Sequence, residues 1–291
     1  MPSKINPKII ILGIDGLEYN LVKEWGLKNL MQKTYCKMDL SEYKVVVTPP
    51  IWGSMLTGKI DEEVMKIWVK QAQVTGHGVN VEQKWWAKLG KYLPFSLAYW
   101  IEFNILSHFI GQDPFQTTVN YVKEKKLPNI FQFFKKPWTN GIPSYGRKII
   151  TKESKRLLKD AVQGRQGPYR QFIMDDYKED KKQLFSILDK KDHDLIFWYT
   201  TLIDNFGHMD SGKPIKLMKH YLEMNEVAGK VKKSCPGAII YILSDHGMER
   251  MEPKKNAWGM HSNHAFFSSS NGEKIEKPYQ FYDLISKHKS E

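Results

Sequence analysis

Acidic and imidazole side chains follow several apolar runs of this chain, each close to where the run ends. Asp15 follows KIIILGI, Asp204 follows DLIFWYTTLI, and Asp245 and His246 follow AIIYILS. A carboxylate at the end of a buried strand is costly unless it is paired or binds a cation. Mixed carboxylate and imidazole donors suit zinc, whereas magnesium and calcium prefer oxygen ligands alone. These residue types therefore indicate a zinc site, and manganese is the alternative metal.

Two further segments add donors of the same kind. DNFGH places Asp204 and His208 four positions apart, so both can reach one ion if the intervening turn is helical. GMHSNH adds His261 and His264 after a glycine. Taken singly, each of these residues also suits a turn, a helix N-cap or a surface position. Their joint occurrence favours the metal site.

The elements that must position these residues can be read from hydrophobic periodicity. Continuous apolar runs without polar alternation are typical of strands that are covered on both faces of a parallel sheet. Four runs have this character: residues 8–14, 44–47, 194–203 and 238–243. Residues 17–33 and 214–232 carry apolar side chains at helical spacing. The sequence predicts an α/β fold with a central, mostly parallel sheet between helices and a site at the carboxyl ends of the strands.

Size and composition describe a globular protein with anionic partners. The chain has 291 residues, of which 41% are hydrophobic, enough for one large domain or two small ones. Its formal net charge of +12 favours phosphorylated metabolites, nucleic acid or acidic lipid, although the dispersed lysines indicate a solvated basic surface. Cys36 and Cys235 are expected to be buried thiols without a disulfide. No secretory signal pattern opens the chain, so we expect a cytoplasmic location.

The motifs, in their chain order, resemble those of the alkaline phosphatase superfamily, and most closely its type I phosphodiesterase/nucleotide pyrophosphatase branch. GIDG at 13–16 resembles the first metal-binding aspartate motif, and TPPIWGSMLTG at 48–58 resembles the nucleophile segment. DNFGH, SDHG and GMHSNHAFF resemble the remaining ligand motifs. The resemblance covers residues 8–58 and 194–267; between them only NIFQFF and GIPSYG are recognisable.

This resemblance implies two divalent metal ions and a threonine nucleophile. One ion would be held by Asp204, His208 and His261, and the other by Asp15, Asp245 and His246 with Thr48 bound to it. His264 competes with His261, but the glycine two places before His261 favours the latter. Thr48 would form a phosphothreonine intermediate; Ser54 and Thr57 are the alternative nucleophiles, interpreted as helix N-terminal hydroxyls.

Departures from the family pattern bear on specificity. Ile51 stands where nucleotide pyrophosphatases carry an asparagine three places after the nucleophile, and no CxPxR sulfatase motif is present. No arginine resembles the one that clamps a monoester in alkaline phosphatases. We therefore expect a small-molecule phosphate ester, preferably a diester, or a nucleotide as substrate, and the sequence carries no specific nucleic-acid-binding motif. The alternatives are a cofactor-independent phosphomutase, a phosphomonoesterase, or a catalytically silent module that binds phosphorylated ligands.

Residues 61–136 differ in composition from their flanks and are predicted to form an inserted cap. The catalytic core would then comprise residues 1–60 and 137–291. The insert carries four tryptophans, Trp68, Trp85, Trp86 and Trp100, which could contact the organic part of a substrate. Ordinary packing between elements is the alternative interpretation.

Within this insert, residues 93–111 are nearly all apolar and about long enough to cross a membrane. Their polar interruptions argue instead for a buried or lid helix: Pro94, Glu102, Asn104 and His108. We expect no transmembrane segment, and contact of the aromatic insert with a membrane surface is the less favoured alternative.

Overall fold

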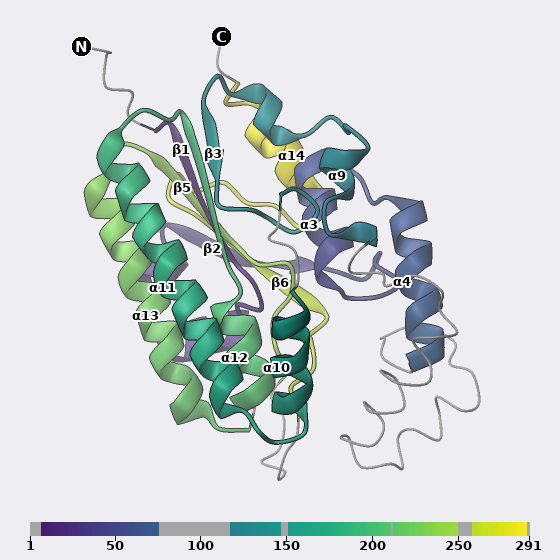
Figure 1. The fold of residues 1–291 in the computed structure, drawn as a ribbon. Helices are drawn as coiled ribbons and strands as arrows, with labels where there is room; N and C mark the ends of the chain where they lie inside the picture. Colours follow the sequence, from purple (N-terminus) through teal and green to yellow (C-terminus); the bar gives the residue numbers. More distant parts are fainter. Residues whose placement is uncertain (1–6, 76–116, 147–150, 211, 250–257, 290–291) are drawn as a thin grey trace.

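The described part of the chain forms a six-stranded sheet with helices on both faces (Figure 1). The computed structural model describes residues 7–75, 117–146, 151–210, 212–249 and 258–289. The strand order is β2-β6-β5-β1-β4-β3. The strands are β1 (Ile9–Ile14), β2 (Thr34–Asp39), β3 (Pro137–Thr139), β4 (Leu195–Thr200), β5 (Ile239–Leu243) and β6 (His264–Ser269). Strands β5, β1, β4 and β3 run parallel and β6 is antiparallel to both its neighbours, which confirms the expected mostly parallel α/β fold.

Helices connect the strands and cover the two faces of the sheet. On one face lie α11 and α13, while α3 and α14 lie on the other (Figure 1). The described helices are α1 (Tyr19–Glu24), α2 (Lys28–Met31), α3 (Thr48–Thr57), α4 (Glu62–Thr75), α9 (Tyr121–Glu124), η2 (Ile130–Phe133), α10 (Lys152–Val162), α11 (Gly167–Lys190), α12 (Leu202–Asp210), α13 (Pro214–Ser234) and α14 (Gln280–Ser286).

Strand β1 shows why the apolar runs lack polar alternation. Ile10 and Leu12 belong to the hydrophobic cluster that includes α11 and α13, whereas Ile9 and Ile11 belong to the cluster that includes α3 and α14. All four side chains are fully buried. Each contributes about 1.5–3 kcal/mol by burial, so a polar residue at either face of β1 would be costly.

Two sequence predictions about these elements were wrong. Residues 44–47 form no strand; they lead as an irregular connection into α3, with Val45 and Val46 buried. The helix expected over residues 17–33 is divided into α1 and α2 at Gly26, whose φ is +61°. The helix expected over 214–232 is present as α13.

The predicted cap is only partly described. Residues 93–111, Trp85, Trp86 and Trp100 lie outside the described residues, so the division into core and cap stays a prediction. On α4, Trp68 is buried against Tyr121, and its indole N–H donates to Thr118 Oγ1 at 3.2 Å.

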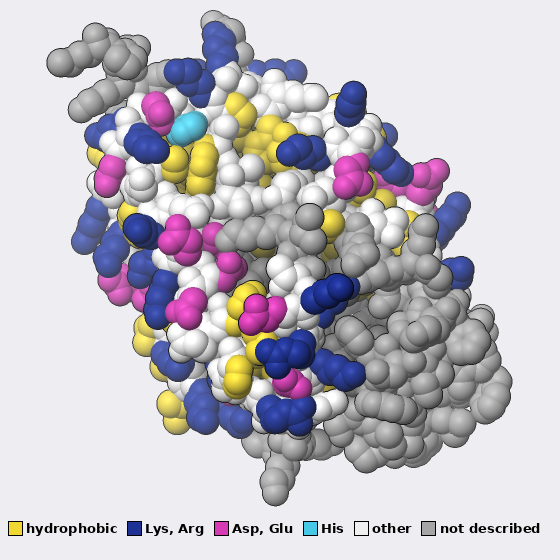
Figure 2. All heavy atoms as spheres, in the orientation of Figure 1, with side chains coloured by type: hydrophobic (Ala, Val, Ile, Leu, Met, Phe, Trp, Pro, Cys, Tyr) yellow, Lys and Arg dark blue, Asp and Glu magenta, His cyan; other side chains and the backbone are white. Residues whose placement is uncertain are grey.

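Other features of the described residues can be compared with the sequence. None of the described helices combines the length and apolar character needed to cross a membrane. Both cysteines are free; Cys235 is buried as expected, whereas Cys36 is only half-buried. On the face shown in Figure 2, lysine and arginine side chains are scattered rather than gathered in one groove. The cytoplasmic location stays a prediction of the sequence.

The turn after β1 packs directly against the first turn of α12. Gly16 has a φ of +71°, and a Cβ on it would lie 2.7 Å from the Cα of Asp204. Only glycine allows this backbone conformation and this close approach together. The contact brings the residue before Gly16, Asp15, close to Asp204.

We expect Gly16→Ala to weaken both stability and metal binding, because Cβ would push α12 away from the β1 turn. Gly26→Ala is the matched control: its φ is also positive, but nothing lies within 4 Å of the added Cβ. Both variants should lose about 1–2 kcal/mol through left-handed strain, and Gly16→Ala should lose more. Urea unfolding and zinc titration of the two variants measure the difference. Equal losses in both would show that the close approach is unimportant.

Candidate metal centre

The structure brings the seven sequence-predicted site residues together at one edge of the sheet. This convergence follows from topology, because the parallel strands β5, β1 and β4 all end at that edge. The residues and their positions are Asp15 in the turn after β1, Thr48 at the start of α3, Asp204 and His208 on α12, Asp245 and His246 after β5, and His261 in the loop before β6.

Asp204, His208 and His261 form one compact group of donor atoms. Oδ1 of Asp204 lies 3.3 Å from Nε2 of His208 and 3.6 Å from Nε2 of His261, and the two Nε2 atoms are 3.2 Å apart. In a tetrahedral zinc site with bonds of 2.0–2.1 Å, neighbouring ligand atoms are about 3.3–3.4 Å apart. The group therefore has the spacing of three ligands around one small dication.

A second group lies around Nε2 of His246. This nitrogen is 3.4 Å from Oδ1 of Asp15, 3.3 Å from Oδ2 of Asp245 and 3.5 Å from Oγ1 of Thr48. These distances again match a tetrahedral ligand shell. The hydroxyl of Thr48 thus belongs to the second group of donors.

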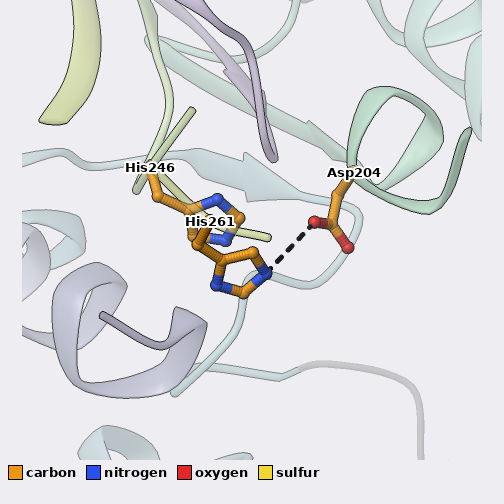
Figure 3. Close-up of side chains that lie close together, drawn as sticks. All are labelled: Asp204, His246 and His261. Carbon is orange, nitrogen blue, oxygen red and sulfur yellow. Dashed lines mark ion pairs between the residues drawn. The ribbon is translucent and has the colours of Figure 1, made fainter. Parts of the chain in front are cut away.

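The two groups are adjacent. The rings of His246 and His261 stack with centroids 3.6 Å apart, and one ligand atom each of Asp204, His246 and His261 also lies within 4.8 Å of the others. Figure 3 shows these three side chains, with Asp204 on α12 facing His261. His246 therefore lies at the boundary between the two groups.

Backbone carbonyls orient all three imidazoles. Nδ1 of His208 donates to the carbonyl of Gly259 at 2.7 Å, Nδ1 of His246 to that of Gly247 at 3.1 Å, and Nδ1 of His261 to that of Val46 at 3.1 Å. When Nδ1 carries the proton, the lone pair of the neutral ring is on Nε2. All three lone pairs consequently point into the cluster, as metal ligation requires.

The carboxylates of the cluster are buried without the usual compensation. Among the described residues, no hydrogen-bond donor reaches Oδ1 of Asp15, Oδ1 of Asp204 or either oxygen of Asp245. Burial and the neighbouring Asp15 raise the pKa of Asp245 well above its ordinary value, and burial and Asp204 raise the pKa of Asp15. Burial, with His246 and His208 nearby, holds the pKa of His261 well below 6.5. Facing lone pairs and crowded carboxylates both fit bound dications.

His264 does not join this cluster. It begins β6, and its Nε2 lies 2.9 Å from Oε1 of Glu18. The two histidines that the sequence left in competition therefore have different surroundings, and the geometry favours His261 as the ligand.

Sequence reasoning missed three residues at or near the cluster, Tyr199, Asn140 and Glu18. The hydroxyl of Tyr199, at the end of β4, donates to Oδ2 of Asp15. Asn140 bonds both the N–H and the carbonyl of Tyr199 at 2.8 Å and so holds its backbone. Glu18 is the partner of His264. In the sequence, the only signal for these residues was a polar group within an otherwise apolar pattern.

The sequence predicted that the alternative nucleophiles, Ser54 and Thr57, lie at the start of a helix. This prediction was wrong. Ser54 is fully buried in the middle of α3 and donates to the carbonyl of Ile51 at 2.7 Å. Thr57 ends α3 and donates to the carbonyl of Gly53 at 2.8 Å. The side chain of Ile51 is fully buried and cannot bind a phosphoryl oxygen.

Two adjacent carboxylate–histidine groups with a hydroxyl in one of them have the layout of a two-metal hydrolase of phosphoric esters. The sequence profile of the type I phosphodiesterase / nucleotide pyrophosphatase family matches residues 9–268, and the chain belongs to this family. It is therefore a hydrolase acting on phosphoric ester bonds.

Similar solved structures are distant in sequence. Alkaline phosphatase from the Antarctic bacterium TAB5 is 10% identical, with 99% of this chain and 100% of that one covered and a TM-score of 0.39. The PH0037 protein from Pyrococcus horikoshii is 13% identical, with 99% of both chains covered and a TM-score of 0.38. Murine ectonucleotide pyrophosphatase/phosphodiesterase 5 is 13% identical, with 83% of this chain and 57% of that one covered and a TM-score of 0.36. No curated protein matches the chain.

Zinc or manganese is expected to raise the melting temperature of chelator-treated protein, because a dication relieves the repulsion in the cluster. An ion at 100 times its Kd stabilises by about 2.7 kcal/mol. Asp245→Asn should make the metal-free protein more stable, since one crowded carboxylate is gone. Added metal should stabilise this variant less than it stabilises the wild type. Differential scanning calorimetry with and without metal measures both effects.

The exposed Asp283 on α14 offers the matched control. Asp283→Asn should retain the full stabilisation by metal, because its carboxylate lies outside the cluster. Metal-independent melting of the native protein would contradict the assignment of the cluster as a metal centre.

Proposed function

We propose that this chain hydrolyses a phosphodiester or pyrophosphate bond of a small organic phosphate or nucleotide through a phosphothreonine intermediate on Thr48. The observation that carries the proposal is the place of the Thr48 hydroxyl, 3.5 Å from Nε2 of His246, beside buried carboxylates with oxygen atoms that lack a hydrogen-bond partner among the described residues.

Two divalent ions, zinc or manganese, would complete the site. Bound there, they supply positive charge that lowers the pKa of a hydroxyl and neutralises phosphoryl oxygens. Asp204, His208 and His261 would hold one ion, and Asp15, Asp245 and His246 the other.

The backbone around Thr48 suits a nucleophile that must not move. Val47 is extended, and Thr48 then begins α3, with Pro49 and Pro50 next in the helix. The two prolines restrict φ on this corner, and the buried Ser144 hydroxyl donates to the carbonyl of Pro49 at 2.6 Å. Thr48 therefore presents its hydroxyl from a rigid helix start, which reduces the entropy lost when it attacks.

In the first step, the Thr48 hydroxyl gives its proton to solvent water and its oxygen attacks phosphorus. The bond from phosphorus to the leaving oxygen breaks, and the leaving alcohol or phosphate departs with the bonding electrons. In the second step, water attacks the phosphorus of phosphothreonine, the bond to the Thr48 oxygen breaks, and the hydroxyl is restored.

The charges around the site favour a diester over a monoester. In the described part of the chain, the ion pairs of the cluster carboxylates join them only to cluster histidines, with no lysine or arginine among their partners. The non-bridging oxygens of a diester carry one negative charge, which two dications can neutralise without a further cation, whereas a monoester dianion carries two.

Thr48→Ala is expected to retain the fold and the bound metal but to lose turnover by several powers of ten, because the attacking oxygen is absent. Thr57→Ala is the control on the same helix and should keep its activity, since that hydroxyl bonds only to backbone. Turnover of bis-p-nitrophenyl phosphate and mass spectrometry of the quenched enzyme measure the two effects. A trapped phosphopeptide modified at Ser54 would show that the nucleophile is misplaced.

Matched p-nitrophenyl esters test the substrate class. The wild-type protein should show the higher kcat/KM for the diester, for the charge reason given above. A preference for the monoester would contradict the diesterase proposal, and isomerisation of a sugar phosphate without release of phosphate would identify a mutase. Binding of both esters without turnover, in protein loaded with metal, would identify a silent binding module.

A further inference from the structure

Glu18 is a buried carboxylate that accepts four hydrogen bonds from three separate segments. Its Oε1 accepts from the backbone N–H of Asn20 and from Nε2 of His264, both at 2.9 Å. Its Oε2 accepts from the backbone N–H of Met248 at 3.1 Å and from Oγ of Ser262 at 3.0 Å. Only the first of these bonds lies within its own helix region. The other three come from the two loops that carry His246 and His261.

These two histidine loops, residues 245–248 and 259–264, meet at Glu18. The N–H of Gly247 donates to the carbonyl of His264 at 2.9 Å, and the N–H of Ser262 donates to the carbonyl of Gly247 at 3.0 Å. A Cβ on Gly247 would lie 2.1 Å from Oε2 of Glu18. Glycine at this position therefore makes room for the carboxylate between the loops.

We propose that Glu18 is the positioning residue of the metal centre, holding the two histidine loops against the turn after β1 so that Nε2 of His246 and of His261 face the carboxylates. Glu18 follows Asp15 by three residues, so one short segment supplies a ligand and the anchor for two others. The inference rests on the proposed function of the cluster as a metal site.

The chemistry of the four donors requires a carboxylate at this position. An ionised carboxylate only accepts hydrogen bonds, so it satisfies four donors at once, whereas an amide would direct its own NH₂ group at some of them. Burial raises the pKa of Glu18, but the bonds from His264 and Asn20 outweigh it and hold the pKa below 4.5. Glu18 is thus an ionised anchor at neutral pH.

A simpler role would be that of an N-cap for α1, since Glu18 accepts from Asn20 N–H. Loss of a cap lowers the stability of the fold and would leave metal affinity unchanged. Metal affinity therefore separates the two roles, because three of the four bonds go to the histidine loops.

The test is a zinc titration of metal-free protein against a chromophoric chelator, for the wild type, Glu18→Gln and Ser262→Ala. We expect Glu18→Gln to bind zinc about 10–100-fold more weakly, the range typical when the support that orients metal ligands is disturbed. Ser262→Ala removes one of the four bonds and should shift affinity in the same direction by less. It also provides the test if Glu18→Gln does not fold. The control variant is Glu24→Gln, because Glu24 carries an exposed carboxylate at the end of α1. It should bind zinc like the wild type.

The outcomes are distinguishable. Wild-type zinc affinity in Glu18→Gln and Ser262→Ala, or an equal loss in Glu24→Gln, would overturn the positioning role while leaving the proposed function intact. Absence of zinc and manganese binding by the wild-type protein itself would overturn the proposed function and the positioning role with it.

Discussion

The structure depends on one electrostatic constraint, the burial of several carboxylates beside imidazole lone pairs. Asp15, Asp204 and Asp245 have oxygen atoms that no donor among the described residues reaches, and Nε2 of His208 faces Nε2 of His261 at 3.2 Å. Neither arrangement is favourable in a protein interior unless positive charge lies between the groups. The surrounding fold is the scaffold that maintains this arrangement and places the Thr48 hydroxyl beside it.

That scaffold acts mainly through the backbone. Parallel strands that end at one edge bring ligands from distant parts of the chain together, and Gly16 lets the β1 turn contact α12 directly. Three backbone carbonyls then select the tautomer of the three histidines. Side chains add a further layer, because Tyr199 donates to Asp15 and Glu18 binds both histidine loops. Rigid outer support of this kind is what precise metal coordination needs.

Much of the fold and of the candidate site could be predicted because burial leaves a clear mark on sequence. Strands β1, β4 and β5 are covered on both faces, so they appear as unbroken apolar runs that end in Asp or in Asp-His. Strand β2 was missed because it lies at the sheet edge with most of its side chains partly exposed and carries polar residues. Residues 44–47 have the β-branched composition of a strand but pair with none, since pairing depends on distant partners rather than on local propensity.

The sequence by itself determined which residue types could bind a metal, that most of them follow buried strands, and that Thr48 follows an apolar run. Only the tertiary structure shows that His261 and His264, which are three positions apart, lie in different surroundings. His261 donates to the carbonyl of Val46 and faces His208, whereas His264 begins β6 and pairs with Glu18. The physical reason is that each ring is oriented by hydrogen bonds to segments far away in the chain, and no local pattern records those partners.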